Sequence, residues 1–404
     1  MVVSIAPYCL SFSQQTCHSN YISKHIALSK YRRDIRRGCL RRPQILPSTL
    51  GDAVGLRVFV LSDLHTDYTE NMEWVKCLPT VGYKNDVLIV AGDVAETYKN
   101  FIVTMSLLKD RFEHVLYVPG NHDLWCRHEG EIYLDSHQKL KKLLDTCRGL
   151  GVQTSPMVLD GLGIIPLFSW YHESFDREEE ITSIHVLPLE MACKDFKACK
   201  WSKELSNGDI SLALYFDAMN EKNQSVIKEI QNTCNQIITF SHFVPRSYIL
   251  LIGFQFRQEL CPEKRMLFYP KLPKIIGSDC LEFRIRSIHG VEGSPSACHV
   301  FGHTHFCWDS VLHGISLKVP NNVSGYSQVN DEQCRYVQAP LAYPRERKRR
   351  MNGGDKWLPF CIYSHGKFSD RLSPCYWSDY YSTNPRTPHN TQLAPWVARF
   401  YNQT

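Results

Sequence analysis

The sequence predicts an α/β fold, because strand-like and helix-like segments alternate along its first half. The strand-like segments are short apolar runs rich in strand-forming residues, at 58–61, 87–90 and 115–118. The helix-like segments are 97–110 and 131–150, and the second places Leu140, Leu143, Leu144 and Cys147 on one helical face. Such alternation is typical of sheets that are covered by helices.

The second half of the chain continues this pattern with longer connections. We expect strands at 164–168, 236–240, 299–301 and 315–319, and a helix at 211–234. The connection 246–296 is long and contains several prolines, so it should carry small elements of its own. Residues 366–404 are rich in Tyr, Trp, Pro and Asn, which predicts an extension packed on the domain.

Composition excludes several classes of protein. With 404 residues, 43% apolar and 22% charged, the chain is too long for a disulfide-stapled miniprotein and too apolar for a mostly disordered one. Its candidate apolar run, 248–256, is far shorter than the roughly 20 residues that span a bilayer. The sixteen cysteines include no Cys-x-x-Cys pair, which argues against a zinc ribbon or a redox dithiol.

The positive charge of the chain lies at its N-terminus. Residues 1–50 hold eight Lys or Arg and one acid, a balance of +7, so the rest of the net +5 chain sums to −2. An Arg- and Ser-rich, acid-poor segment predicts an organelle transit peptide, and its many hydroxyls favour the chloroplast over the mitochondrion. The alternative is a disordered basic tail on a cytoplasmic protein. The acidic body argues against a nucleic-acid binder.

Five polar motifs follow predicted strands. They are Asp63-Leu64-His65, Gly92-Asp93, Gly120-Asn121-His122-Asp123, Ser241-His242 and Gly302-His303-Thr304-His305. Each alone is compatible with an ordinary turn at a strand end. As an ordered set they are not, because the spacings of 30 from Asp63 to Asp93 and 28 from Asp93 to Asn121 each fit one strand–helix–strand step.

In this order the five motifs resemble the signature of the calcineurin-like metallophosphoesterase superfamily. The resemblance covers roughly residues 55–365, and no motif is missing or substituted. It implies a single domain built as a two-sheet β-sandwich flanked by helices (αββα), with the 246–296 segment as an insertion. It also implies hydrolysis of a phosphate ester by a metal-bound hydroxide.

The resemblance further implies a site for two divalent metal ions. One ion would be held by Asp63, His65 and His305, and the other by Asn121, His242 and His303, with Asp93 bridging them. His122 would lie over the substrate phosphate, and Asp123 would orient it.

The chemistry of these residue types supports such a site independently. Two divalent ions and two carboxylates leave about two positive charges, which suits a phosphate anion. Nitrogen ligands favour Mn, Fe or Zn over Mg or Ca.

Three other segments carry weaker signals. His172 follows a predicted strand and could line the substrate cleft, and Arg246 could contact a phosphate, although packing or surface roles are as strongly indicated. Ala342 stands where the family often has a Gly before a Tyr, so we do not carry that element over to Tyr343. The basic run 345–350 suits a polyphosphate or nucleic acid, but a solvated loop is the favoured interpretation.

Several functions remain open at this stage. A small phosphorylated substrate is expected, and monoesterase, phosphodiesterase and nuclease branches share the motifs. A protein phosphatase and a non-catalytic scaffold are further alternatives, and the scaffold would predict eroded ligands.

Overall fold

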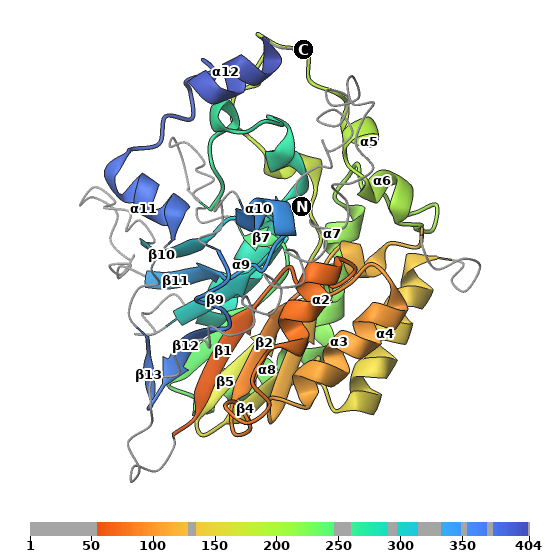
Figure 1. The fold of residues 1–404 in the computed structure, drawn as a ribbon, viewed down its shortest axis with the longest axis vertical. Coiled ribbons are helices and arrows are strands. Elements are labelled where there is room, and N and C mark those ends of the chain that lie inside the picture. The colour runs from red at the N-terminus through yellow and green to blue at the C-terminus, as the bar shows by residue number, and fades with distance from the viewer. Residues whose placement is uncertain are drawn as a thin grey trace, which may run out of the picture.

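Two β-sheets pack face to face and helices cover both outer faces, as Figure 1 shows. This computed structural model describes residues 55–127, 135–245, 260–289, 297–313, 333–348, 354–369 and 375–402. Buried side chains from both sheets form one continuous apolar core, which includes Val60, Ile89, Leu116, Ile238 and Val300. The predicted fold class, an αββα sandwich, is therefore confirmed.

The first sheet has five strands in the order β13-β12-β1-β2-β3. They are β1 (Arg57–Leu61), β2 (Val87–Ala91), β3 (His114–Val118), β12 (Phe360–Ser364) and β13 (Lys367–Phe368). The first three are parallel, and β12 joins them antiparallel from the far end of the chain. Helices α2 (Thr69–Lys76), α3 (Tyr98–Lys109) and α4 (Ser136–Leu150) lie on this side of the molecule.

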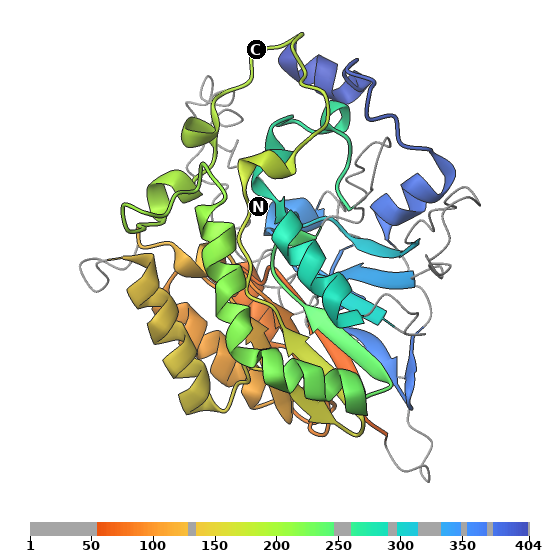
Figure 2. The same ribbon diagram turned by 180° about the vertical axis from the view of Figure 1, so that it is seen from behind.

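The second sheet has six strands in the order β10-β11-β9-β6-β5-β4. They are β4 (Met157–Leu159), β5 (Leu162–Pro166), β6 (Gln236–Phe240), β9 (Ala297–Phe301), β10 (Trp308–His313) and β11 (Gln333–Gln338). Figure 2 shows the helices α7 (Ser211–Asn220), α8 (Gln224–Thr233) and α9 (Asp279–His289) over this sheet. Isoleucines of α8 and α9, among them Ile227, Ile230 and Ile285, pack with Ile165 and Ile237 in a separate apolar layer.

Short elements complete the structure. They are η2 (His122–Leu124), η3 (Glu173–Phe175), α5 (Leu189–Ala192), α6 (Asp195–Ala198), η4 (Glu221–Asn223), β7 (Val244–Pro245), η5 (Lys264–Met266), η6 (Leu272–Ile275), β8 (Gly277–Ser278), α10 (Pro344–Lys348), α11 (Tyr376–Thr383) and α12 (Pro395–Tyr401). The described part of the predicted insertion thus holds η5, η6, β8 and α9. The C-terminal helices contact it and the second sheet, since the Ala394 amide donates to the Arg265 carbonyl and Tyr381 stacks on Trp308.

Most predicted elements are present, with shifted ends. The strand expected at 164–168 begins and ends two residues earlier. The helix expected at 211–234 is interrupted by η4, because the Asn220 amide turns inward and bonds both the amide and the carbonyl of Phe168. The helix expected at 131–150 is described from Ser136, where Asp135 caps it. The strand expected at 315–319 lies outside the described residues.

The parallel strands bring the five motifs to one edge of the molecule. The carboxyl ends of parallel strands meet at the same edge of a sheet, and this holds for β1–β3 and for β5, β6, β9 and β11. Backbone hydrogen bonds then tie the two sheets together there. The Ser62 amide donates to Ala339, and the Leu341 amide donates back to Ser62. In the described part of the chain, no helix is long and apolar enough to cross a bilayer.

Val90→Ala tests how much the central strand contributes to stability. Val90 is fully buried, so losing two carbons and leaving a cavity should reduce the free energy of unfolding by about 2–3 kcal/mol. Val81→Ala is the matched control, because Val81 is 78% exposed. Urea denaturation measures the stability of both variants. The slope of unfolding free energy against urea concentration should be the same for both. Equal midpoints for the two would show that β2 is not part of the core.

Candidate metal centre

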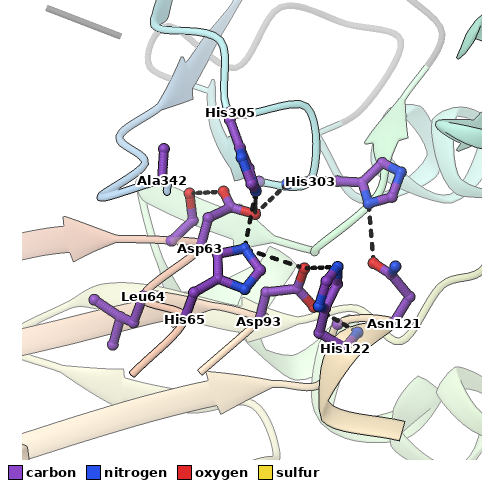
Figure 3. A network of polar contacts seen from close by, with 12 residues as sticks. Asp63, Leu64, His65, Asp93, Asn121, His122, His303, His305 and Ala342 are labelled. Atoms are coloured by element: carbon purple, nitrogen blue, oxygen red, sulfur yellow. Dashed lines mark hydrogen bonds and ion pairs between the residues drawn. The ribbon is translucent and has the colours of Figure 1, made fainter. Parts of the chain in front are cut away.

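The loops after five strands supply seven side chains to one buried cluster. Asp63 and His65 follow β1, Asp93 follows β2, and Asn121 follows β3. His242 follows β6, and the pair His303 and His305 follows β9. All seven are almost completely buried. Figure 3 labels six of them, all but His242, and shows these six pointing toward one another.

The first group of ligand atoms comprises Asp63, His65, Asp93 and His305. All four ligand atoms lie within 4.8 Å of one another. The Nε2 atoms of His65 and His305 are 2.9 Å apart, and His305 Nε2 is 3.4 Å from Asp63 Oδ1. An Oδ2 atom of Asp93 is 3.8 Å from His65 Nε2. One ion could contact all four.

The second group comprises Asp93, His242 and His303, joined by the amide of Asn121. The ligand atoms of Asp93, His242 and His303 again lie within 4.8 Å of one another. The Asn121 Oδ1 atom is 3.1 Å from His242 Nε2 and 3.0 Å from His303 Nδ1. Asp93 belongs to both groups. The geometry therefore places the candidate ligands in two groups that share one carboxylate.

Three of the four histidines, in their neutral form, present a lone pair to the cluster. The far nitrogens of His242 and His303 bond the carbonyl oxygens of Ala91 and Ile275, both at 2.9 Å. The far nitrogen of His305 bonds Glu346 Oε2 at 2.7 Å. A carbonyl can only accept, so a hydrogen lies on the far nitrogen, and in the neutral ring the near nitrogen is then an acceptor. Converging acceptors repel one another, so this donor set fits cations.

Asp93 has the environment expected of a bridging ligand. Its Oδ1 accepts the His122 amide, whereas its buried Oδ2 has no hydrogen-bond partner. Burial opposes ionisation, but the rings of His242 and His122 outweigh it and hold the pKa of this carboxyl well below its usual range. Burial likewise lowers the pKa of His242, yet the same carboxylate prevails and raises that pKa to about 9. A metal ion must therefore displace a proton from His242.

The backbone of the cluster adopts uncommon conformations. Among the described residues, eight other than glycine have positive φ, and five of these are Asp63, His65, Asp93, His303 and His305. Such residues cost free energy and persist where the surrounding structure imposes them, often at functional sites. Sharp turns after each strand aim consecutive polar side chains into one place.

His122 lies beside the cluster between Glu96, Tyr343 and Trp125. Its Nδ1 is 3.3 Å from Glu96 Oε1, and its Nε2 is 3.3 Å from the Tyr343 hydroxyl. The Trp125 ring stacks on it with centroids 3.7 Å apart. Burial opposes ionisation of Glu96, but His122 and then Arg127 lower the pKa of this carboxyl to about 2. Glu96 is thus an anion that orients His122.

The predicted role of Asp123 is wrong, because its carboxylate does not touch the His122 ring. It accepts the backbone amides of Asp93, Val94, Ala95 and Gly120 and the hydroxyl of Tyr117. Burial, followed by the charge of Asp93, raises the pKa of Asp123 to about 6. Asp123 therefore shapes the loop that carries Asp93 and does not orient the imidazole.

Tyr343 and Glu346 belong to the site although the sequence interpretation left them out. Ala342 has φ +59, the conformation that a glycine would adopt at this place, so the following Tyr343 packs against His65 and His305. Because an alanine stands where the family often has a glycine, the sequence did not identify Tyr343 as part of the site. The positive φ of Ala342 does identify it.

The basic run 345–350 is only partly a solvated segment, contrary to the favoured interpretation. Its described part forms α10, in which Glu346 is buried against His305. Arg347 turns inward to Asn71 and to the carbonyls of Leu341 and Ala342. The helix closes the loop that carries Tyr343, which is why these two residues are not solvated.

His172, one of the two predicted substrate residues, makes hydrogen bonds away from the cluster. His172 bonds the Ser174 hydroxyl and accepts the Asp279 amide, so it joins η3 to α9. Its neighbours Trp170 and Tyr171 are buried, and Tyr171 stacks on His303. Arg246 lies outside the described residues. Roles for His172 and Arg246 in substrate binding remain predictions.

Comparison with known proteins agrees with this geometry. The profile of the calcineurin-like phosphoesterase family matches residues 56–213. The matched segment contains the first three of the five motifs, Asp63 to Asp123, so this part of the chain is similar to that family. The resemblance found in the motifs is thereby confirmed, and the predicted enzyme class, a hydrolase acting on phosphoric ester bonds, agrees with this family.

Two mycobacterial comparisons are more specific. The acyl-carrier-protein phosphodiesterase PptH of Mycobacterium tuberculosis is 34% identical over 125 residues, which cover 29% of this chain and 38% of the relative. The chain thus aligns with well under half of that relative's length. The crystal structure of the phosphopantetheinyl hydrolase PptH from the same organism superposes with a TM-score of 0.50 and 20% identity, covering 80% of this chain and 98% of that one. This structural likeness shows a shared fold.

Gly92→Ala should disturb the second ligand group. Gly92 has φ +81, and a Cβ there would lie 2.4 Å from the ring of His242. Gly161→Ala is the matched control, since Gly161 has φ +76 but no atom within 4 Å of such a Cβ. We expect the control to lose about 1–2 kcal/mol from backbone strain and to keep its metal. Gly92→Ala should lose more stability and part of its metal, as elemental analysis would measure. Equal metal content would refute the role of Gly92.

Proposed function

We propose that the chain is a metal-dependent phosphodiesterase with a dinuclear centre. The observation that carries this proposal is the shared Asp93, whose unpartnered oxygen faces imidazoles from both ligand groups. Mn, Fe or Zn suits the nitrogen-rich ligand set. When bound, two such ions neutralise the phosphate and lower the pKa of a coordinated water.

The chain's own residues supply proton transfer and orientation. With Glu96 accepting from Nδ1, His122 presents Nε2 toward Asp93 Oδ2, 4.0 Å away, beside the Tyr343 hydroxyl. When a phosphate–oxygen bond breaks, the departing alkoxide needs a proton. His122 can donate it from Nε2, while Glu96 stays hydrogen-bonded to Nδ1 and holds the ring in place. Tyr343 packs against His65 and His305, so it limits access of water from that side.

The substrate class we favour is the phosphodiester that joins a carrier protein to phosphopantetheine. The names of the mycobacterial relative describe an acyl-carrier-protein phosphodiesterase and a phosphopantetheinyl hydrolase. Three cationic residues near His122, which we call the cationic rim, favour a substrate whose phosphate is attached to a protein. They are Arg127, Lys194 and Arg345. Arg127 and Lys194 lie over the Trp125 ring and Arg345 over the Tyr343 ring, at 4.3, 5.9 and 5.7 Å.

The three cations of the rim influence one another. Burial and then the charges of Arg127 and Arg345 lower the pKa of Lys194. Arg127 is paired with Glu96 at 2.6 Å. The positive charge therefore gathers around the two aromatic residues that flank His122, where an acidic surface beside the scissile phosphate would lie.

A direct test uses the metal-free chain with Mn²⁺ added back. Hydrolysis of holo-acyl-carrier protein, bis-p-nitrophenyl phosphate and p-nitrophenyl phosphate should require the metal, with the two diesters preferred. Asp93→Asn should lower turnover by more than about a hundredfold, because the bridging carboxylate is lost. Asp110→Asn, at an exposed carboxylate, should leave turnover unchanged.

Two outcomes would refute the proposal. Hydrolysis that survives both chelation and Asp93→Asn would exclude a metal mechanism. A preference for the monoester would move the chain to the monoesterase branch, and cleavage of nucleic acid alone would move it to the nuclease branch.

The rim predicts that a carrier-protein substrate depends on charges that a small diester does not need. Lys194→Gln and Arg345→Gln together should raise the KM for holo-acyl-carrier protein about three- to tenfold, more at low salt. The KM for bis-p-nitrophenyl phosphate should not change. Lys197→Gln is the control, since Lys197 is exposed and lies on α6, the short helix that begins directly after Lys194. Equal KM values for the carrier protein would exclude the rim as its docking site.

The chloroplast location inferred from residues 1–50 remains a proposal. A fusion of these residues to a fluorescent protein should enter plastids of plant cells. Import into mitochondria, or cytoplasmic fluorescence, would select one of the alternatives.

A further inference from the structure

A buried carboxylate, Asp195, lies directly behind the second ligand group. It is 2% exposed and begins the short helix α6, far in sequence from every motif. Its Oδ1 accepts the Asn121 side-chain amide at 2.8 Å and the Trp125 indole at 2.7 Å. The metal-ligand motifs do not include it, and its backbone is held by Asn207, which donates to its carbonyl at 3.1 Å.

The chemistry of these contacts fixes which way the Asn121 amide faces. An ionised carboxylate only accepts hydrogen bonds, and an indole nitrogen only donates them. The NH₂ group of Asn121 must therefore face Asp195. Its carbonyl oxygen then faces His242 and His303, 3.1 and 3.0 Å away. With the amide reversed, an NH₂ group would point where a cation is to bind, and the second group would lose its oxygen ligand.

The same carboxylate oxygen also supports His122. By accepting from the indole nitrogen, it fixes the ring of Trp125, and that ring stacks on His122 with an interplanar angle of 29°. The imidazole is thus held between Glu96 at its Nδ1 edge and Trp125 on its face. One acceptor therefore stands behind a candidate ligand and the candidate proton donor.

We propose that Asp195 is a positioning residue that sets the amide of Asn121 for the second metal ion and, through Trp125, the ring of His122. This inference rests on the proposed two-metal function and adds a residue that acts through other residues. Carboxylates behind metal ligands commonly change metal affinity about 10–100-fold.

The test titrates Mn²⁺ into the metal-free chain and its variants and measures the affinity of each equivalent by calorimetry. Asp195→Ala should weaken one equivalent about 10–100-fold and leave the other within about threefold. Asp195→Asn should rescue most of this loss, because its amide oxygen can accept from both Asn121 and Trp125. The EPR signal of coupled manganese ions should weaken in Asp195→Ala and persist in Asp195→Asn.

Asn220→Ala is the structural control. Asn220 is 2% exposed and bonds the backbone amide and carbonyl of Phe168. It should lower the melting temperature of the metal-free chain while both Mn²⁺ affinities stay within about threefold. Unchanged affinities in Asp195→Ala would overturn the inference, as would an equal loss in Asn220→Ala. If the unaltered chain bound no Mn²⁺, the proposed function and this inference would both fall, whereas two intact equivalents in Asp195→Ala would overturn the inference alone.

Discussion

The buried carboxylate of Asp93 is the constraint on which the rest of the site depends. Its charge lies between three imidazoles, and one of its oxygens has no hydrogen-bond partner. Such a group is costly to bury unless cations compensate it. Its loop is accordingly built around it, since Asp123 gathers four backbone amides there and Gly92 leaves room for the His242 ring. Stability and metal binding are coupled at this residue.

The two sheets supply different ligands to the site. The first sheet supplies the carboxylates, one imidazole and the amide, and the second supplies the other three imidazoles. Neither sheet alone completes a ligand group, because Asp63 and His65 need His305, and Asn121 needs His242 and His303. The hydrogen bonds between Ser62 and the segment after β11 hold the two edges together. The packing of the two sheets against each other therefore also brings the ligands of the site together.

The residues that orient the cluster lie in a different kind of segment from the ligands themselves. Ligands come from motifs at strand ends, whereas the groups that orient them come from connecting segments. Glu346 behind His305, Glu96 behind His122 and Asp195 behind Asn121 each lie in a helix or loop with no motif. The rim that we assign to substrate recognition lies in the same kinds of segment. Variation in these segments can change the substrate while the metal ligands stay the same.

The sequence by itself determined the α/β class, most strands along the chain and, through the resemblance that its motifs carry, all seven ligand candidates, because strand periodicity and the polar residues at strand ends are local signals. Which residues orient those ligands was decided only by tertiary structure. Asp123 adjoins His122 yet bonds the backbone, while Glu96 and Tyr343, 26 and 221 positions away, reach the ring. Ala342 at a positive φ kept Tyr343 from recognition. Hydrogen bonds between distant segments depend on packing, which no local pattern records.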